Sequence, residues 1–476
     1  MFARLLNLFK KDYYLLWIII LVVVGGFLRF YRLDAFVTFL GDQARDAIVI
    51  KKIITFEHFP AIGAPTSVGQ IYLGPFYYYF IAPWLAIFRF EPIGLAFGVA
   101  FFSTLYIPVN YFVVKDLVNK DTALISTVFI TFSYILIEFS RFSWNPNLLP
   151  VFSLLAVYFF IKAVRVDQIT PYILAGAFLS FSVQLHYLAV FLIPPIVAYF
   201  INKKPNIRNL LFSLFSFIFF SIPLLIFDLR HNLLNIKSFL KLSQSSGNIA
   251  GNKLLSIFDS FLSLNRYSFN IEFNSLISAF ILLGIIASLI LIWRKGQKIK
   301  TVLLFFLLPF LGIALYGGPK FPHYLGVIYP LYFIVIAYFL SYFLNNPGGK
   351  VLLSVFLVVF VFFNFRGYSF IHAKSSHQIE IARSISKIIY DNVKSDKYAI
   401  AAIPEYSDHT YRYFLDVWSR RPTERNSREK TNELFVVCEV KCWPIGDSQW
   451  TIAYFAPNKV VNKWTVRNFT IYKLIR

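Results

Sequence analysis

Long apolar stretches separated by short polar segments run through the first 365 residues of the chain. The stretches 15–28 and 351–363 contain no charged residue. A helix at the surface of a soluble protein has one apolar and one polar face, whereas these stretches are apolar all round. Runs of about 18 to 20 such residues are typical of membrane spans. The pattern therefore predicts an all-α polytopic membrane domain over residues 1–365.

We expect about eleven spans and one apolar segment that stays at the interface. Basic residues mark cytoplasmic loops. Three apolar segments lie between Asp42 and Arg141, and all the basic clusters fall on the cytoplasmic side only if one of these segments does not cross the membrane. The segment 71–88 contains one glycine and two prolines, so we interpret it as interfacial or re-entrant. Residues 172–200 are too long for one ordinary span, which predicts two short ones with His186 and Tyr187 at their outer tip. The expected spans are 13–30, 92–114, 122–139, 148–161, 172–200 (as two), 210–227, 273–293, 302–316, 325–344 and 351–363.

Two larger external regions are expected, a loop and a C-terminal domain. The segment 228–272 is polar and rich in Asn and Ser, so we expect a long external loop there. After residue 365 charged residues become frequent, which predicts a small external α/β domain over residues 366–476. Apolar residues recur at helical spacing over 379–393, which predicts a helix. Short strands are expected at 398–403, 433–437, 451–455 and 469–474.

The chain carries 46 Lys and Arg against 24 Asp and Glu, a net charge of +22. On a soluble protein this excess would indicate nucleic-acid binding, but here many basic residues lie in short loops, where they orient the spans and contact anionic lipid. We therefore expect no nucleic-acid partner. The two cysteines, Cys438 and Cys442, form either a disulfide or two free thiols and belong to no zinc-type cluster. The clearest cytoplasmic clusters are Arg4/Lys10/Lys11, Lys162/Arg165, Lys203/Lys204/Arg208 and Arg294/Lys295/Lys298/Lys300.

The segment GDQARDA, residues 41–47, carries the strongest chemical signal of the first external loop. Charged residues beside membrane spans are costly, so they are candidates for function. In a helix, Asp42 and Asp46 share one face because they are four residues apart, and Arg45 can pair with a nearby carboxylate. Alternatively, Asp42 is the helix N-cap and accepts from the backbone N–H of Arg45. Both interpretations remain open from the sequence.

Two further polar segments interrupt the apolar pattern on the external side. RFSWNPN, residues 141–147, has the composition of a cavity wall or of a capped turn that starts the next helix. GGPKFPHY, residues 317–324, is a short rigid loop whose Lys320 and His323 are either phosphate-binding donors or plain solvated side chains. The candidate substrate-binding residues are Arg141, Asn145, His186, Tyr187 and Tyr324.

These motifs together resemble the GT-C membrane glycosyltransferases. The resemblance is carried by FLRFYRLD, GDQARDA, YLGPFYYY and RFSWNPNLLP, between residues 27 and 160, and more weakly by GGPKFPHYLGVIYP. It is clearest to the glycosyltransferase family 39-like branch, which contains protein O-mannosyltransferases and aminoarabinose transferases of lipid A. The resemblance implies a GT-C fold, a lipid-phosphate sugar donor that enters from the membrane, and an active site on the external face. The tail from residue 366 matches no motif of the family.

The same resemblance implies roles for single residues. In the family, the first external loop carries an acidic motif whose aspartate is catalytic, and Asp42 matches that aspartate. Gln43 stands where a glutamate is common, which weakens the case for a second acid or a metal there, although Asp46 could compensate. Asn145 stands near the second external turn, where the family tends to have an acidic residue.

We therefore predict a glycosyltransferase that moves a sugar from a polyprenyl-phosphate donor to a lipid, glycan or protein acceptor outside the cytoplasm. Asp42 is the expected general base for the acceptor hydroxyl, with Asp46 as a second catalytic carboxylate. Arg45, Lys320 and His323 are expected to meet the leaving phosphate. No cofactor is identified, and a divalent metal remains an open alternative. The rival functions are a transporter or flippase of lipid-linked saccharides, which more often shows repeated halves, a polymerase or ligase of them, and a non-catalytic protein with a sensing tail.

Overall fold

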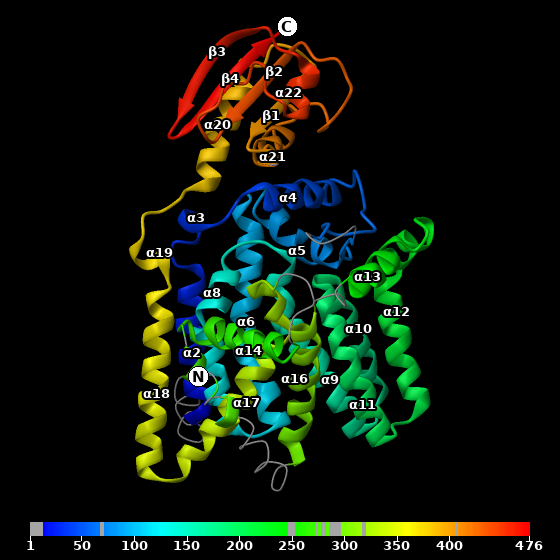
Figure 1. The fold of residues 1–476 in the computed structure, drawn as a ribbon, viewed down its shortest axis with the longest axis vertical. Helices are drawn as coiled ribbons and strands as arrows, with labels where there is room; N and C mark the ends of the chain where they lie inside the picture. Colours follow the sequence, from blue (N-terminus) through cyan, green and yellow to red (C-terminus); the bar gives the residue numbers. More distant parts are fainter. Residues whose placement is uncertain are drawn as a thin grey trace, which may run out of the picture.

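The computed structural model is a bundle of helices that carries a small sheet domain at one end (Figure 1). Within the part of the chain that the structure describes, six helices are long and apolar enough to cross a membrane, which confirms a multi-pass membrane protein. They are α2 (Tyr13–Phe30), α6 (Ile93–Leu117), α9 (Leu149–Val166, with the turn before it), α12 (Ile207–Arg230), α16 (Gln297–Leu315) and α18 (Pro347–Arg366). The structure describes residues 13–66, 71–245, 253–272, 274–277, 279, 282–284, 297–316, 320–405 and 407–476.

Shorter and broken helices occupy most of the remaining apolar stretches. The stretch predicted at 172–200 is divided at His186, as expected, because the backbone of His186 is extended between two helices. The stretch predicted at 122–139 is bent by 56° at Ser133, where the backbone is also extended. These elements are α7 (Lys120–Phe132), α8 (Tyr134–Ser140), α10 (Ile169–Leu185), the 3₁₀ turn η2 (Tyr187–Leu192), α11 (Ile193–Lys203) and α17 (Tyr329–Ser341).

The predicted interfacial segment 71–88 contains the short helix α5 (Phe76–Ile87). It has 12 residues, so it is about 18 Å long, well short of the roughly 30 Å that a span must cover. Tyr77, Tyr78 and Ile81 are buried, which packs α5 into the protein rather than exposing it to lipid on all sides. The length and the burial support the interfacial interpretation.

The segment 228–272, predicted as a long external loop between spans, contains two helices that the sequence did not predict. They are α13 (Leu234–Ser245) and α14 (Lys253–Phe269). Both are amphipathic, and polar residues on one face made the segment look like a loop, while Phe261 and Leu264 bury the other face of α14. The span expected at 273–293 falls largely outside the described residues.

The C-terminal domain contains a four-stranded sheet in the order β1-β2-β4-β3. The two inner strands, β2 and β4, are largely buried. β1 runs parallel to β2, and β4 is antiparallel to both β2 and β3. Cys438 at the end of β2 forms a disulfide with Cys442. The elements are α20 (Gln378–Asn392), β1 (Tyr398–Ile403), α21 (His409–Val417), β2 (Glu433–Cys438), α22 (Trp450–Phe455), β3 (Lys459–Val466) and β4 (Phe469–Ile475).

Two sequence predictions for this domain need correction. The strand expected at 451–455 is the helix α22, whose N-terminus is capped because the Gln449 side chain accepts from the backbone N–H of Ile452 at 3.1 Å. The edge strand β3 was missed because most of its side chains are exposed, so its sequence lacks the apolar alternation of a half-buried strand.

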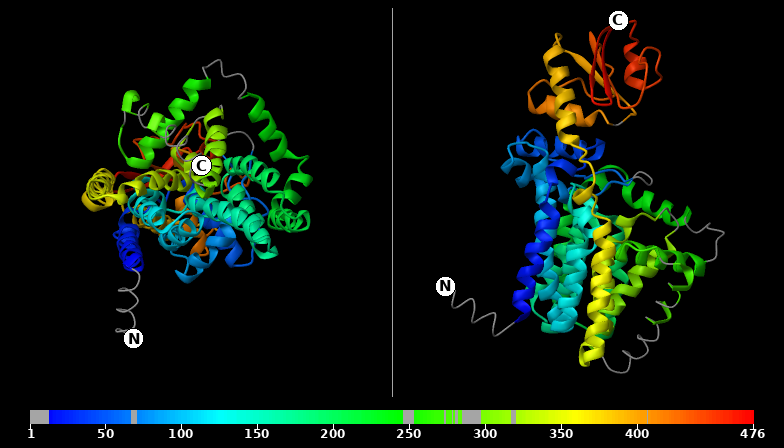
Figure 2. Two further views of the ribbon diagram at one scale, coloured as in Figure 1. Left: turned by 90° about the horizontal axis from the view of Figure 1, so that it is seen from below. Right: turned by 90° about the vertical axis from the view of Figure 1, so that its left-hand side faces the viewer.

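The helix α4 (Gly41–Ile54) lies across the end of the bundle, directly beneath the C-terminal domain (Figures 1 and 2). It packs against α5 on the bundle side and against α21 on the domain side. The backbone N–H of Phe39 donates to Gln378 at 2.8 Å, and the Tyr413 hydroxyl donates to the carbonyl of Phe90 at 2.6 Å. The first loop after α2 therefore holds the C-terminal domain against the bundle.

Candidate active site

The start of α4 is capped by Gln43 and not by Asp42. The residue before the helix is Leu40, and the Gln43 side chain accepts from its backbone N–H at 3.1 Å. Gln43 is buried, whereas the Asp42 side chain remains 57% exposed. The capping interpretation of Asp42 is therefore wrong, and its carboxylate is free for another role.

Arg45 connects the two carboxylates of α4. Its Nη1 donates to Asp42 Oδ1 at 2.8 Å, while its Nη2 and Nε donate to Asp46 Oδ1 at 2.8 and 3.0 Å. The Tyr78 hydroxyl of α5 donates to the same oxygen of Asp46 at 2.9 Å. Two of the three guanidinium nitrogens of Arg45 are thus bound by the buried Asp46, and the third is bound by the exposed Asp42.

Asp42 and Asp46 have opposite surroundings although they are four residues apart. The Asp46 side chain is completely buried, and burial raises the pKa of its carboxyl, with Arg45 and Tyr78 opposing the shift in part. Its Oδ2 has no hydrogen-bond partner among the described residues. Burial would lower the pKa of Arg45, but Asp46 and Asp42 more than offset this and raise it, so its guanidinium stays charged. Asp46 therefore acts as an anchor for Arg45.

A cavity of about 60 Å³ opens beside the exposed end of this arrangement, and we call it the active-site cavity. It brings together side chains from four polar segments that are far apart in the sequence. Seven of the residues that the sequence suggested line it: Asp42, Arg45, Asn145, His186, Tyr187, His323 and Tyr324. The remaining lining residues are Ala64, Pro65, Thr66, Leu73, Trp144 and Pro146.

Two histidines form the inner wall of the active-site cavity. The ring centres of His186 and His323 lie 5.5 Å apart, and the ring of His323 packs edge-on against Trp144 at 4.5 Å. Burial lowers the pKa of His186 to about 3, with a contribution from His323, and burial lowers the pKa of His323 to about 4. Both imidazoles are therefore neutral near pH 7 in this structure, and a neutral His323 can donate a hydrogen bond to a phosphate.

Asn145 presents an uncommitted amide to the same cavity. Its side chain is 1% exposed, and neither its oxygen nor its nitrogen has a hydrogen-bond partner among the described residues. A buried polar group without a partner costs roughly 1–3 kcal/mol. Asn145 is therefore a buried, unpaired member of the cavity lining, and its substrate-binding role stays a prediction.

Three of the suggested residues lie elsewhere. Lys320 is occupied by Ser256 Oγ at 2.9 Å, Ser260 Oγ at 2.8 Å and a backbone carbonyl of α16 at 2.6 Å, so it ties α14 to α16. Arg141 donates to backbone carbonyls at and beyond the end of α2, which makes it a helix-terminating group. Asp46 lies behind Arg45, outside the lining of the cavity. Lys320 and Arg141 therefore lie outside the lining of the cavity, and their expected contacts with phosphate and substrate stay predictions.

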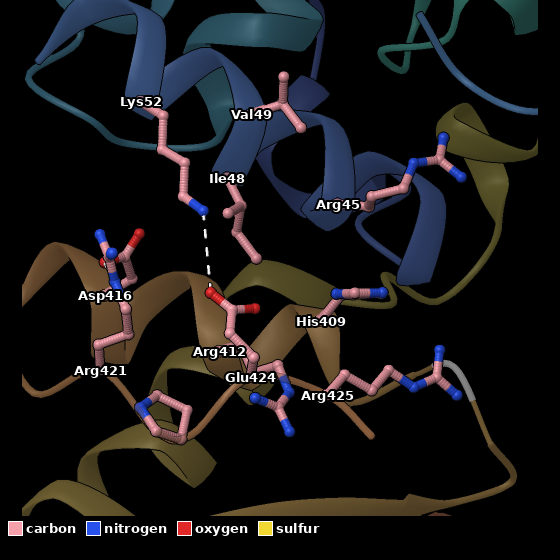
Figure 3. Close-up of a pocket in the computed structure, with 11 residues that line it drawn as sticks. Arg45, Ile48, Val49, Lys52, His409, Arg412, Asp416, Arg421, Glu424 and Arg425 are labelled. Atoms are coloured by element: carbon pink, nitrogen blue, oxygen red, sulfur yellow. Dashed lines mark hydrogen bonds and ion pairs between the residues drawn. The ribbon is translucent and has the colours of Figure 1, made fainter. Parts of the chain in front are cut away.

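A second cavity of about 120 Å³, here called the interdomain cavity, lies beside the contact between α4 and the C-terminal domain and is lined by residues of both (Figure 3). Lys51 pairs with Asp416 at 3.4 Å, and Arg421 pairs with the same carboxylate at 2.6 Å. Lys52 faces Glu424 at 4.0 Å, which Figure 3 draws as a dashed line. Arg45 lines this cavity as well as the active-site cavity. These domain residues were not predicted from the sequence, because the tail carries no recognisable motif.

The fold and the site define a class: a multi-pass membrane protein of the GT-C glycosyltransferase fold, with a polar cavity beneath a docked C-terminal domain. Residues 73–227 match the profile of the family described as dolichyl-phosphate-mannose-protein mannosyltransferase. No curated protein matches the sequence closely enough to count as a relative.

Several solved structures are similar to most of this chain, among them those of ArnT and AglB. The structure of ArnT from Cupriavidus metallidurans bound to undecaprenyl phosphate covers 96% of this chain and 98% of that chain, at 13% identity and a TM-score of 0.64. The structure of the oligosaccharyltransferase AglB from Archaeoglobus fulgidus, in complex with an inhibitory peptide and a dolichol-phosphate, covers 90% of this chain and 70% of that chain, at 14% identity and a TM-score of 0.56. These likenesses confirm the GT-C fold that the motifs implied.

Proposed function

We propose that the protein is a glycosyltransferase that transfers a sugar from a polyprenyl-phosphate donor to an acceptor hydroxyl outside the cytoplasm. The observation that carries this proposal is the Asp42–Arg45 pair at the active-site cavity, with one exposed carboxylate and one anchored cation. The GT-C fold supports it, and so do the lipid phosphates named in the structures of ArnT and AglB.

The chemistry follows from the two charges of this pair. The acceptor hydroxyl attacks the anomeric carbon, gives its proton to the Asp42 carboxylate and forms the new glycosidic bond. The bond between the anomeric carbon and the phosphate oxygen breaks, and the polyprenyl phosphate leaves with its added negative charge facing Arg45. Attack from the face opposite the phosphate inverts the anomeric centre.

Donor binding prepares Asp42 for this role. In the structure, Asp42 Oδ1 accepts from Arg45 Nη1 at 2.8 Å, so this oxygen is engaged by the guanidinium. A phosphate in the cavity competes for the same nitrogen, while Asp46 retains the other two. Binding of the donor therefore releases Asp42 as the base at the moment when the acceptor hydroxyl needs it.

We also propose that the cavity lies on the external side of the membrane. Basic residues gather at the far ends of α9, α11 and α16, and an excess of Lys and Arg marks the cytoplasmic side. The disulfide between Cys438 and Cys442 supports an oxidising compartment for the C-terminal domain. Cysteine labelling and protease protection in sealed vesicles test this orientation.

The purified protein, incubated with a panel of polyprenyl-phosphate sugars and with lipid, glycan or peptide acceptors, should release polyprenyl phosphate. The Asp42→Asn variant should bind the donor but release none, whereas Asp34→Asn changes an exposed carboxylate of the same loop and should keep activity. A transporter would instead move donor across vesicles without release and would tolerate Asp42→Asn. Repeating the assay with a chelator reports whether a divalent metal takes part.

A further inference from the structure

A third cavity lies at the end of the bundle opposite the active-site cavity, and we call it the basic pocket. Its volume is about 530 Å³, within the range of about 300–1,000 Å³ typical of ligand sites. It is formed by the ends of α6, α9 and α11 and the beginning of α16. Because α9 starts beside Asn145 and has 18 residues, about 27 Å of helix separates the basic pocket from the active-site cavity.

The fold gathers cations from three separate basic segments into this pocket. Its lining contains four cationic side chains and, among the described residues that form it, no Asp or Glu. Arg165 has one carboxylate neighbour, Asp116, at 3.4 Å. Lys203 and Lys298 make no ion pair with any residue that the structure describes. The four cations are Arg165, Lys203, Lys298 and Lys300.

Apart from the polar residues Asn202 and Thr301, the rest of the lining is apolar or aromatic and comes from the same helices. Leu117, Ile161, Val164 and Leu304 line it on the bundle side. Tyr199 adds an aromatic ring with a polar tip, the kind of side chain that gathers at the level of lipid headgroups. A cationic rim above an apolar wall fits a ligand that has an anionic head and a hydrocarbon tail.

We infer that the basic pocket binds the phosphate headgroup of an anionic phospholipid, with the start of the acyl chains against the apolar lining residues Leu117, Ile161, Val164 and Leu304. The four cations of the basic pocket complement the charge of an anionic headgroup. Because the pocket lies at the end of the membrane spans, a lipid fits it better than a soluble anion does. This inference does not depend on the proposed glycosyl transfer, because the basic pocket and the active-site cavity share no residue.

The test uses the purified full-length protein in detergent. Phosphatidylglycerol, phosphatidylcholine with the same acyl chains, and inorganic phosphate are titrated in parallel, and the midpoint of thermal unfolding and the lipid retained after chromatography are measured. We expect phosphatidylglycerol alone to bind. The double variant Lys203→Gln/Lys298→Gln should bind it about 25-fold more weakly, because each lysine near an anionic headgroup contributes about fivefold.

Two controls keep the outcome decisive. Lys237→Gln/Lys241→Gln removes the same charge from exposed positions of α13 and should bind like the wild type. Lys203→Arg/Lys298→Arg restores the charge and should restore binding, which separates loss of the site from loss of the fold. Equal binding of phosphatidylcholine, full protection by inorganic phosphate, or unchanged binding by the Gln variant would each overturn the inference.

Discussion

The cations at the two ends of the helix bundle are held in different ways. At the end beneath the C-terminal domain, Arg45 is fixed by Asp42 and Asp46, whereas Lys203 and Lys298 at the opposite end pair with no described residue. A cation fixed by carboxylates has one defined position, which suits chemistry that needs a phosphate at a set distance from a base. Cations without such partners attract an anionic headgroup without fixing its exact pose.

The largest effect is expected from replacing Asp42, the proposed base at the end of the bundle beneath the C-terminal domain. Asp42→Asn should lower kcat by about 10²–10⁴-fold, the usual contribution of a general base, because an amide cannot accept the proton of the acceptor hydroxyl. Donor affinity, measured with a non-reacting donor analogue, should stay equal or rise, since the phosphate no longer competes with a carboxylate for Arg45. A loss of affinity that matches the loss of kcat would mean that Asp42 binds substrate and is not the base.

A double-mutant cycle can distinguish the two roles of Arg45, which are pairing with the buried Asp46 and binding the donor phosphate. Arg45→Gln should cost about 3–5 kcal/mol in the free energy of unfolding, because it leaves Asp46 buried without its cation. It should also weaken donor binding about 10–100-fold, the equivalent of one or two charged hydrogen bonds. Adding Asp46→Asn should recover most of the stability but none of the donor affinity. Recovery of both stability and donor affinity would mean that Arg45 does not bind the donor phosphate.

The neutral histidines of the active-site cavity predict the direction of a pH effect on stability. Their folded pKa values of about 3 and about 4 lie below the value of about 6.5 for an unfolded histidine. The unfolded chain therefore takes up protons first as pH falls, so this part of the stability is fully present above pH 6.5 and declines toward pH 4. His186→Gln/His323→Gln should flatten the dependence of the unfolding midpoint over this window. His231→Gln, at an exposed position, should leave the slope as it is.

A smaller effect is expected where the C-terminal domain meets α4. Asp416 accepts from Lys51 and Arg421, so Asp416→Asn should weaken this contact by about 1–3 kcal/mol. Limited proteolysis should then release residues 366–476 faster, and kcat should fall a few-fold if the contact steadies α4. The exposed pair Lys387–Asp391 on α20 is a matched control, because removing it with Asp391→Asn should cost about 0.5 kcal/mol or less.

The smallest effect is expected at the opposite end of the bundle. Lys203→Gln/Lys298→Gln should change kcat in detergent by no more than about twofold, the range of ordinary surface substitutions. A large loss of activity in detergent without added lipid would show that the two ends are coupled, and the contrast drawn between them would then be too simple.

The local pattern of the chain was enough to predict several of its helices and strands and the positions of several reactive groups, although not α13, α14 or α22. The apolar stretch predicted at 13–30 is α2 with the same bounds, and the strand predicted at 398–403 is β1 with the same bounds. The break at His186 and the pairing of Arg45 with Asp42 also follow from short-range spacing. Such features depend on neighbours within a few residues, which a sequence displays directly.

Long-range contacts decided which of those groups are available. Lys320 and Arg141 resembled free cations in the sequence, but carbonyls and hydroxyls from distant helices occupy their donors. The sequence placed Asp42 and Asp46 on one helix face, and only the hydroxyl of Tyr78 and the depth of the fold showed that Asp46 is buried while Asp42 is exposed. Whether a charged side chain is free or occupied depends on the groups that folding brings beside it from elsewhere in the chain, and spacing along the sequence does not contain that information.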